Sequence, residues 1–139
     1  MEMTIPRAFI SFDYDNNLNE KNLFSGQCKN SRVPFDIEDW SSKERLSQSE
    51  WEKEIKDKIN RCNLLIVLVG SQTYIATGVL KEISFARNQD VPIFGIYVRN
   101  ATTVFTTLPE GLPRYKTINW DWDKIAQKIN ECMQEGKNK

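Results

Sequence analysis

The segment Leu64-Leu65-Ile66-Val67-Leu68-Val69 is apolar at every position. A strand with one solvated face alternates apolar and polar side chains, because successive side chains point to opposite faces of the sheet. An unbroken apolar run therefore predicts a strand buried on both faces, which is typical of the centre of a parallel sheet covered by helices. The run is also far too short to cross a membrane.

Strand-like and helix-like segments alternate along the chain. The other strands are predicted at Arg7–Phe12 and at residues 33–37, 92–98 and 115–119. Helices are predicted at residues 18–30, 48–61 and 79–88, and a closing helix is predicted after Asp121. Asp121 can cap that closing helix, and Ser47 or Ser49 can cap the helix at residues 48–61. Residues 99–113 fit either a degenerate helix or a functional loop.

This alternation predicts an α/β fold with a parallel sheet and helices on both faces. Five strands favour a flavodoxin-like, three-layer arrangement with strand order 2-1-3-4-5. The chain has 139 residues, which is close to the usual size of one domain, so we expect a single domain over residues 1–139.

The chain contains no histidine, and this excludes several classes of enzyme. Ser-His-Asp and Cys-His nucleophiles, HExxH zinc proteases and zinc deaminases all require an imidazole. Lys plus Arg and Asp plus Glu both number 19, so there is no broad positive field to attract nucleic acid or an anionic membrane. We therefore expect neither partner, and we predict no metal site.

Three cysteines occur without a CxxC spacing: Cys28, Cys62 and Cys132. An odd number of thiols at these spacings favours neither a disulfide framework nor a zinc ribbon. Buried, reduced thiols are the simplest interpretation. The first residues lack the basic and then apolar pattern of a signal peptide. Together these features predict a cytoplasmic protein.

In the predicted strand order, ligands bind at the carboxyl ends of strands 1 and 3, where the winding of the sheet reverses. That rule places a candidate site between residues 13–16 and residues 70–74. The chain has no GxxxxGK[ST] or GxGxxG motif, which argues against P-loop hydrolysis and a standard dinucleotide site. A phosphoacceptor receiver domain is excluded because Gly70-Ser71-Gln72, and no aspartate, follows the third strand.

Glu82 is the acidic residue that could face this site from the helix after the third strand. At 100° per residue it lies about 60° from Val79, on the shoulder of the apolar stripe formed with Ile83 and Ala86. Spacing alone favours the alternative, a solvated glutamate beside Lys81, because most charged helix residues lie at the surface. The remaining acids near strand ends fit turns and helix capping as well: Asp13, Asp15, Asp36, Glu38 and Asp39.

Several segments, in this order and spacing, resemble a known family: residues 8–12, Phe35-Asp36, Asp39-Trp40-Ser41, the helix from Trp51 to Cys62, and residues 65–73, 79–83 and 91–96. Over nearly its whole length, the chain resembles the TIR-like domain of the Thoeris antiphage defence system. The resemblance implies a flavodoxin-like fold. In the enzymatic members it also implies cleavage of NAD at the nicotinamide glycosidic bond, giving ADP-ribose or a cyclic nucleotide signal that reaches an effector by diffusion.

The resemblance also implies roles for particular residues. The catalytic glutamate of the family falls on Glu82. Substrate-binding positions fall on Phe12, Asp13, Tyr14, Asp39, Ser71 and Thr73. NAD would be the substrate, and no cofactor is implied. The family often has a tryptophan four residues before the glutamate, where this chain has Gly78. Because nicotinamide leaves a cationic ring as a neutral molecule, one carboxylate can serve without a histidine.

Two other functions remain open from the sequence. A non-catalytic interaction module could use the threonine-rich residues 101–107, which include Val104 and Phe105, or the charged segment Lys43-Glu44-Arg45. A small nucleotide- or flavin-binding protein is compatible with the topology alone, and topology does not fix function. The resemblance also implies homo-oligomerisation, since TIR-like domains often complete their sites across an assembly.

Overall fold

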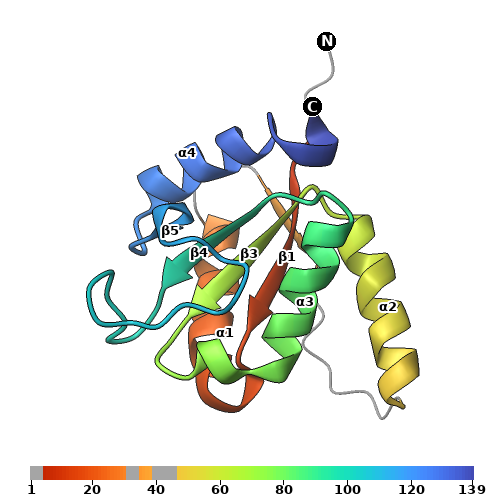
Figure 1. Cartoon of the computed structure of the whole chain (residues 1–139). Helices are drawn as coiled ribbons and strands as arrows, with labels where there is room; N and C mark the ends of the chain where they lie inside the picture. The colour runs from red at the N-terminus through yellow and green to blue at the C-terminus, as the bar shows by residue number, and fades with distance from the viewer. Residues whose placement is uncertain (1–4, 31–34, 39–46) are drawn as a thin grey trace.

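The computed structural model describes residues 5–30, 35–38 and 47–139 of the chain, and it contains one parallel sheet (Figure 1). Its strands are β1 (Arg7–Phe12), β2 (Asp36–Glu38), β3 (Leu64–Val69), β4 (Ile93–Tyr97) and β5 (Thr117–Ile118). All neighbouring strands pair in parallel, in the order β2-β1-β3-β4-β5. The predicted fold class and strand order are confirmed.

Helices cover both faces of the sheet. They are α1 (Tyr14–Asn30), α2 (Gln48–Asn60), α3 (Thr77–Asn88) and α4 (Trp122–Cys132), with short 3-10 turns η1 (Thr73–Ile75), η2 (Arg114–Lys116) and η3 (Gly136–Asn138). Figure 1 shows α1 and α4 on one side of the sheet and α2 and α3 on the other. Within the described residues, no helix combines the length and apolar character needed to span a membrane.

The central strand β3 is buried at every position, as its apolar run predicts. Leu64, Ile66 and Leu68 pack into the cluster under α1 and α4. The alternate residues of β3 pack into the cluster under α2 and α3. Each fully buried Leu or Ile stabilises the fold by roughly 1.5–3 kcal/mol. A one-residue slip would move every side chain of β3 to the opposite face, so this packing favours a single register with β1 and β4.

Two predicted helix caps are present. Ser47 Oγ accepts a hydrogen bond from the Glu50 backbone N–H at 3.2 Å, and Asp121 Oδ1 accepts from the Asp123 N–H at 2.9 Å. Each cap satisfies a backbone donor that the first helical turn leaves without an internal partner. The local sequence therefore defines where α2 and α4 begin.

Other boundaries differ from the prediction. Helix α1 begins at Tyr14, four residues earlier than predicted, because the Asp13 carbonyl oxygen already accepts the Asn17 N–H at 2.7 Å. Strand β5 has two residues instead of five, because the 3-10 turn η2 precedes it. Residues 99–113 contain neither helix nor strand. The start of the predicted second strand falls on residues 31–34, outside the described residues.

The three cysteines are buried and form no disulfide, as predicted. Burial raises the pKa of the Cys28 thiol to about 11 and that of the Cys132 thiol to about 12. Since the thiolate is the nucleophile, thiols with such pKa values are unreactive near neutral pH. The cysteines therefore belong to the core of the protein.

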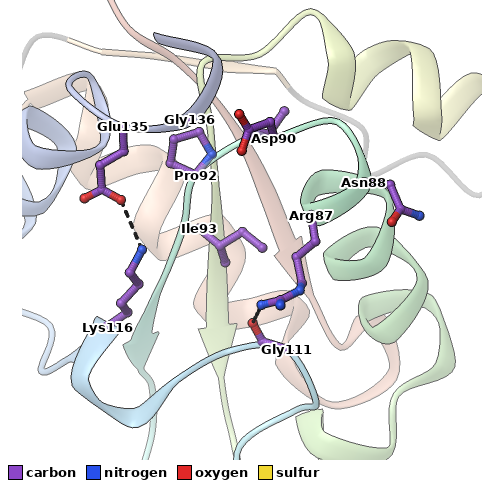
Figure 2. A pocket seen from close by; sticks show the side chains of 10 residues that line it. Arg87, Asn88, Asp90, Pro92, Ile93, Gly111, Lys116, Glu135 and Gly136 are labelled. Atoms are coloured by element: carbon purple, nitrogen blue, oxygen red, sulfur yellow. Dashed lines mark hydrogen bonds and ion pairs between the residues drawn. The ribbon is translucent and has the colours of Figure 1, made fainter. Parts of the chain in front are cut away.

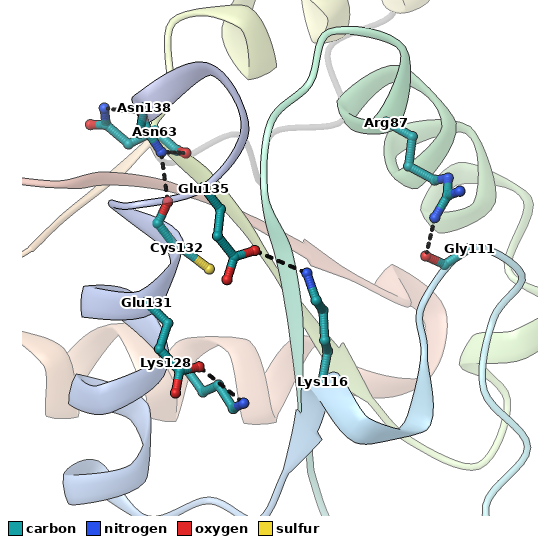
Figure 3. A network of polar contacts seen from close by, with 9 residues as sticks. All are labelled: Asn63, Arg87, Gly111, Lys116, Lys128, Glu131, Cys132, Glu135 and Asn138. Atoms are coloured by element: carbon teal, nitrogen blue, oxygen red, sulfur yellow. Dashed lines mark hydrogen bonds and ion pairs between the residues drawn. The ribbon is translucent and has the colours of Figure 1, made fainter.

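The segment after α4 is attached to the amino edge of the sheet (Figure 3). Asn138 Nδ2 donates hydrogen bonds to the Asn63 and Cys132 carbonyl oxygens at 2.8 and 3.0 Å. Asn63 Nδ2 returns a bond to Asn138 Oδ1 at 3.1 Å. The Lys137 N–H donates to the Asp90 carbonyl oxygen at 2.8 Å. These bonds connect the end of α4 to the turns that precede β3 and β4.

Candidate functional site

Glu82 lies in the second turn of α3 and faces the sheet. The residue is only 9% exposed, so the structure differs from the solvated position that helical spacing alone favoured. Ser11 Oγ, on β1, donates a hydrogen bond to Glu82 Oε1 at 2.7 Å. The hydroxyl of Ser11 and the carboxyl of Glu82, which are distant in the sequence, are therefore hydrogen-bonded to each other between the sheet and α3.

The alternation of β1 explains why Ser11 meets α3. Phe9 packs into the cluster under α2 and α3, whereas Ile10 packs into the opposite cluster. Ser11 shares the face of Phe9 because side chains two residues apart point the same way. It pairs with Val67 of β3, close to the carboxyl ends of both strands. Glu82 is thus held near the point where the winding of the sheet reverses.

Burial dominates the ionisation of Glu82. It raises the pKa of this carboxyl to about 8, and the hydrogen bond from Ser11 acts in the opposite direction. A buried carboxyl that changes charge near neutral pH is a frequent feature of functional sites, because its protonation state can be matched to a reaction. Glu82 is therefore the strongest candidate for a reactive carboxylate in the described residues.

Asp13 is engaged in the turn that begins α1. Asp13 Oδ1 accepts a hydrogen bond from the Asp15 N–H at 3.2 Å, and Oδ2 accepts one from Asn16 Nδ2 at 2.6 Å. The side chain is buried. This is the capping geometry that the sequence offered as the alternative to substrate binding. A ligand would have to compete with these local bonds for the Asp13 carboxylate.

Phe12 and Tyr14 lie together on the other side of β1 from Glu82. Their ring centroids are 6.0 Å apart, and both rings are half-buried. Phe12 packs against the cluster under α1 and α4, whereas Ser11 faces α3. The structure therefore does not place the Phe12 ring on the same face of the sheet as the Glu82 carboxylate.

The loop after β3 uses one of its two predicted hydroxyls internally. Thr73 is fully buried, and its Oγ1 accepts the Gly70 N–H at 2.8 Å and donates to the Leu68 carbonyl oxygen at 3.4 Å. Ser71, in contrast, is exposed at the carboxyl end of β3. Asp39 lies outside the described residues.

A second buried polar group connects α1 to the loops after β3 and β4, and sequence reasoning missed it. Asn17 is 2% exposed and has backbone angles of φ −126° and ψ 22°, which interrupt the helical geometry of α1. A Cβ at Gly70 would lie 2.6 Å from Asn17 Oδ1, so only glycine allows this approach. Asn17 Nδ2 donates to Glu20 Oε1 at 3.2 Å, and Glu20 forms an ion pair with Arg99 at 2.5 Å.

Ser11 is the other residue that sequence reasoning missed, although a signal for it exists. The residues of β1 at buried positions are apolar apart from Ser11. A single hydroxyl at a core position requires a hydrogen-bond partner. The sequence could therefore have indicated that a polar group faces Ser11, but it could not have identified Glu82 as that group.

Trp51 lies beside the position where the resembled family often has its tryptophan. A Cβ at Gly78 would lie 4.0 Å from both Cη2 and Cζ2 of Trp51. The half-buried Trp51 ring, from α2, packs against the cluster that includes Val79 and Ile83. An indole from a different helix thus covers the start of α3 in this chain.

Two cavities lie away from Glu82. One, of about 420 Å³, is at the amino edge of the sheet between the turn before β4 and the chain after α4 (Figure 2). Two cations line it, but both have partners: Arg87 donates to the Gly111 carbonyl oxygen at 3.1 Å, and Lys116 pairs with Glu135 at 3.0 Å. The other cavity, of about 290 Å³, lies between α3 and residues 110–111. Glu82 lines neither of them.

Residues 9–103, about two thirds of the chain, match the family described as the TIR-like domain of the Thoeris protein ThsB. The chain belongs to this family. Within residues 5–30, 35–38 and 47–139 of this TIR-like domain, no three His, Cys, Asp or Glu side chains form a group that could hold a metal ion.

Solved structures show the same fold. A prokaryotic SEFIR domain superposes with a TM-score of 0.55 and 13% sequence identity, covering 93% of this TIR-like domain and 96% of that chain. The TIR domains of the activated Roq1 resistosome, which directly recognises the pathogen effector XopQ, superpose with a TM-score of 0.51 and 12% identity. This match covers 93% of this TIR-like domain and 84% of that chain. At these identities the likeness concerns the fold. No curated protein matches the sequence.

Proposed function

We propose that this TIR-like domain cleaves NAD at the bond to nicotinamide as part of antiphage defence. The product would be ADP-ribose or a cyclic ADP-ribose-type signal for an effector. The observation that supports the proposal is the buried Glu82 carboxyl, which Ser11 holds at the reversal point of the sheet. Membership of the Thoeris TIR-like family supports the same proposal.

The proposed reaction needs charge stabilisation more than proton transfer. The bond between ribose C1′ and the pyridinium nitrogen breaks, and its electron pair stays on the nitrogen, so nicotinamide leaves as a neutral molecule. Positive charge then develops on C1′ and the ring oxygen of the ribose. A carboxylate at Glu82 stabilises that charge and can accept hydrogen bonds from ribose hydroxyls. Water, or a hydroxyl of the same molecule in cyclisation, adds to C1′ and loses a proton.

Replacement of Glu82 by Gln should lower NAD cleavage by at least about 100-fold, because the neutral amide keeps the shape but loses the stabilising charge. Nicotinamide release is followed by chromatography at pH 8, and the other product is identified by mass spectrometry. Glu54→Gln makes the same chemical change at an exposed position of α2 and should retain full activity. A wild type that releases no nicotinamide at high protein concentration, even with lysate of phage-infected cells, contradicts the proposal.

The pH dependence of the reaction follows from the protonation of Glu82. The carboxylate is the active form in the proposed reaction, and burial raises the pKa of Glu82 to about 8. The kcat/KM for NAD, which reports the free enzyme, should therefore rise about tenfold per pH unit below pH 8 and level off above it. A profile that is flat from pH 6 to 9 would assign the charge stabilisation to another group.

A non-catalytic interaction module is the second candidate, and one observation favours it. Phe105 is 88% exposed, at the tip of a loop that Arg114 holds through the carbonyl oxygens of Thr103 and Thr106. Exposed aromatic side chains on ordered loops are typical of protein-binding surfaces. If wild type does not cleave NAD, and Phe105→Asp abolishes self-association or capture of a partner, this second function replaces the first.

A further inference from the structure

We infer that Ser11 is a positioning residue for Glu82: its hydroxyl holds one oxygen of the carboxylate, which leaves the other oxygen for the sugar of the substrate. This inference rests on the proposed function and adds to it a residue for which the family resemblance gave no role. It also explains why a serine lies in a strand whose other buried residues are apolar.

Packing alone does not account for Ser11. Ser11 is fully buried, and it shares its face of β1 with Phe9. An alanine would fill nearly the same volume without a polar atom. A buried hydroxyl destabilises the folded state unless it is hydrogen-bonded. Its bond to Glu82 must therefore supply the reason for the serine.

The geometry fits a bond to a charged acceptor. The distance from Ser11 Oγ to Glu82 Oε1 is 2.7 Å, at the upper end of the range for an O–H donor on a carboxylate. Within the described residues, Ser11 provides the one side-chain hydrogen bond to Glu82. Because β1 is a central strand paired on both sides, its Ser11 is a rigid point from which to orient a side chain of α3.

Other charges near α3 do not replace this effect. The elements packed against α3 are β1, β3, β4, η1 and α2. From α2, Glu52 forms an ion pair with Lys81 of α3, and Lys56 lies over the ring of Phe85. The pKa of Glu82 responds to burial and to Ser11, so loss of the hydroxyl should raise this pKa further. The other ionisable side chains of α2 are Glu50, Lys53, Glu54, Asp57 and Lys58, and Arg61 follows this helix. Strands β1 and β4 and the turn η1 carry Arg7, Tyr97 and Tyr74, and Asp13 follows β1. Arg87 lies on α3 itself, and Glu110 lines the cavity beside α3.

The kinetic test compares Ser11→Ala, Ser11→Thr and wild type over pH 6–10. Ser11→Ala should lower kcat for NAD cleavage roughly 10-fold or more with little change in KM, because the contact orients the carboxylate and does not bind substrate. It should also move the acid limb of kcat/KM upward by about one pH unit. Ser11→Thr keeps the hydroxyl and should restore the profile. A Ser11→Ala profile that equals that of wild type overturns the inference.

A second measurement does not depend on activity. The Glu82 carboxyl is titrated by NMR in ¹³C-glutamate-labelled protein, and its signal is assigned by its loss in Glu82→Gln. Ser11→Ala should raise the pKa of Glu82, and Ser11→Cys, a weaker donor of similar volume, should raise it less and serves if the alanine variant does not fold. An unchanged titration overturns the inference whatever the activity. If Ser11→Ala shifts the Glu82 titration but the wild type releases no nicotinamide, the proposed function is overturned and the positioning role of Ser11 is not.

Discussion

Glu82→Gln should unfold roughly 10 °C above wild type at pH 8, although it removes the carboxylate proposed to act on NAD. The pKa of Glu82 rises from 4.5 to about 8 on burial. Between these values the folded state binds more protons than the unfolded state, so the stability of wild type falls as pH rises. By pH 8 the loss amounts to about 4 kcal/mol, which a neutral glutamine avoids while it can still accept the Ser11 bond.

Thermal and urea unfolding at pH 5 and pH 8 check this prediction. At pH 5 the Glu82 carboxyl is protonated in the folded protein, and the two chains should differ by less than about 1 kcal/mol. The advantage of Glu82→Gln should then grow through pH 6 and 7. Glu54→Gln, which changes an exposed carboxylate, should follow wild type throughout. A difference between Glu82→Gln and wild type that does not vary with pH would mean that Glu82 ionises normally.

The same substitution thus separates stability from activity. An ionisable group that weakens the folded state at the pH where it is charged is expected at a functional site and is difficult to explain elsewhere. A variant that is more stable but does not cleave NAD would show that burial of Glu82 serves the reaction. A variant that is neither more stable nor less active would remove the basis for both proposals.

The arrangement of the sheet could be predicted because it depends on local patterns. The apolar run Leu64–Val69 requires cover on both faces, and strand–helix alternation with right-handed connections leaves few sheet orders. The capping residues Ser47 and Asp121 mark helix starts by short-range chemistry, and the structure uses both. These signals need no knowledge of contacts between distant residues.

The candidate site depended on contacts that local patterns do not contain. The helical position of Glu82 fits both a solvated and a buried side chain, and Ser11, 71 residues away, decides between them. The interruption of α1 at Asn17 likewise lies against Gly70, which comes from a loop far along the chain. For Asp13, by contrast, the local alternative of capping describes the bonds that its carboxylate makes.

The attachment of the C-terminal segment is another long-range feature, and two glycines test it with opposite expected signs. Gly136 has φ +53°, and a Cβ there would lie 2.3 Å from the Asp90 carbonyl oxygen. That carbonyl cannot retreat without weakening its bond from the Lys137 N–H. Gly136→Ala should therefore lower the free energy of unfolding by about 3 kcal/mol or more, through strain and loss of the contacts around Asn138.

Gly26 provides the matched control, because the same change should there be stabilising. It lies inside α1, and a Cβ at this position would have nothing within 4 Å. Gly26→Ala should raise the free energy of unfolding by about 0.5–1 kcal/mol, since alanine loses less backbone entropy in a helix. Urea unfolding of both variants measures the two effects. If Gly136→Ala were as stable as wild type while Gly26→Ala gained stability, the segment after α4 would not be attached in solution as the structure has it.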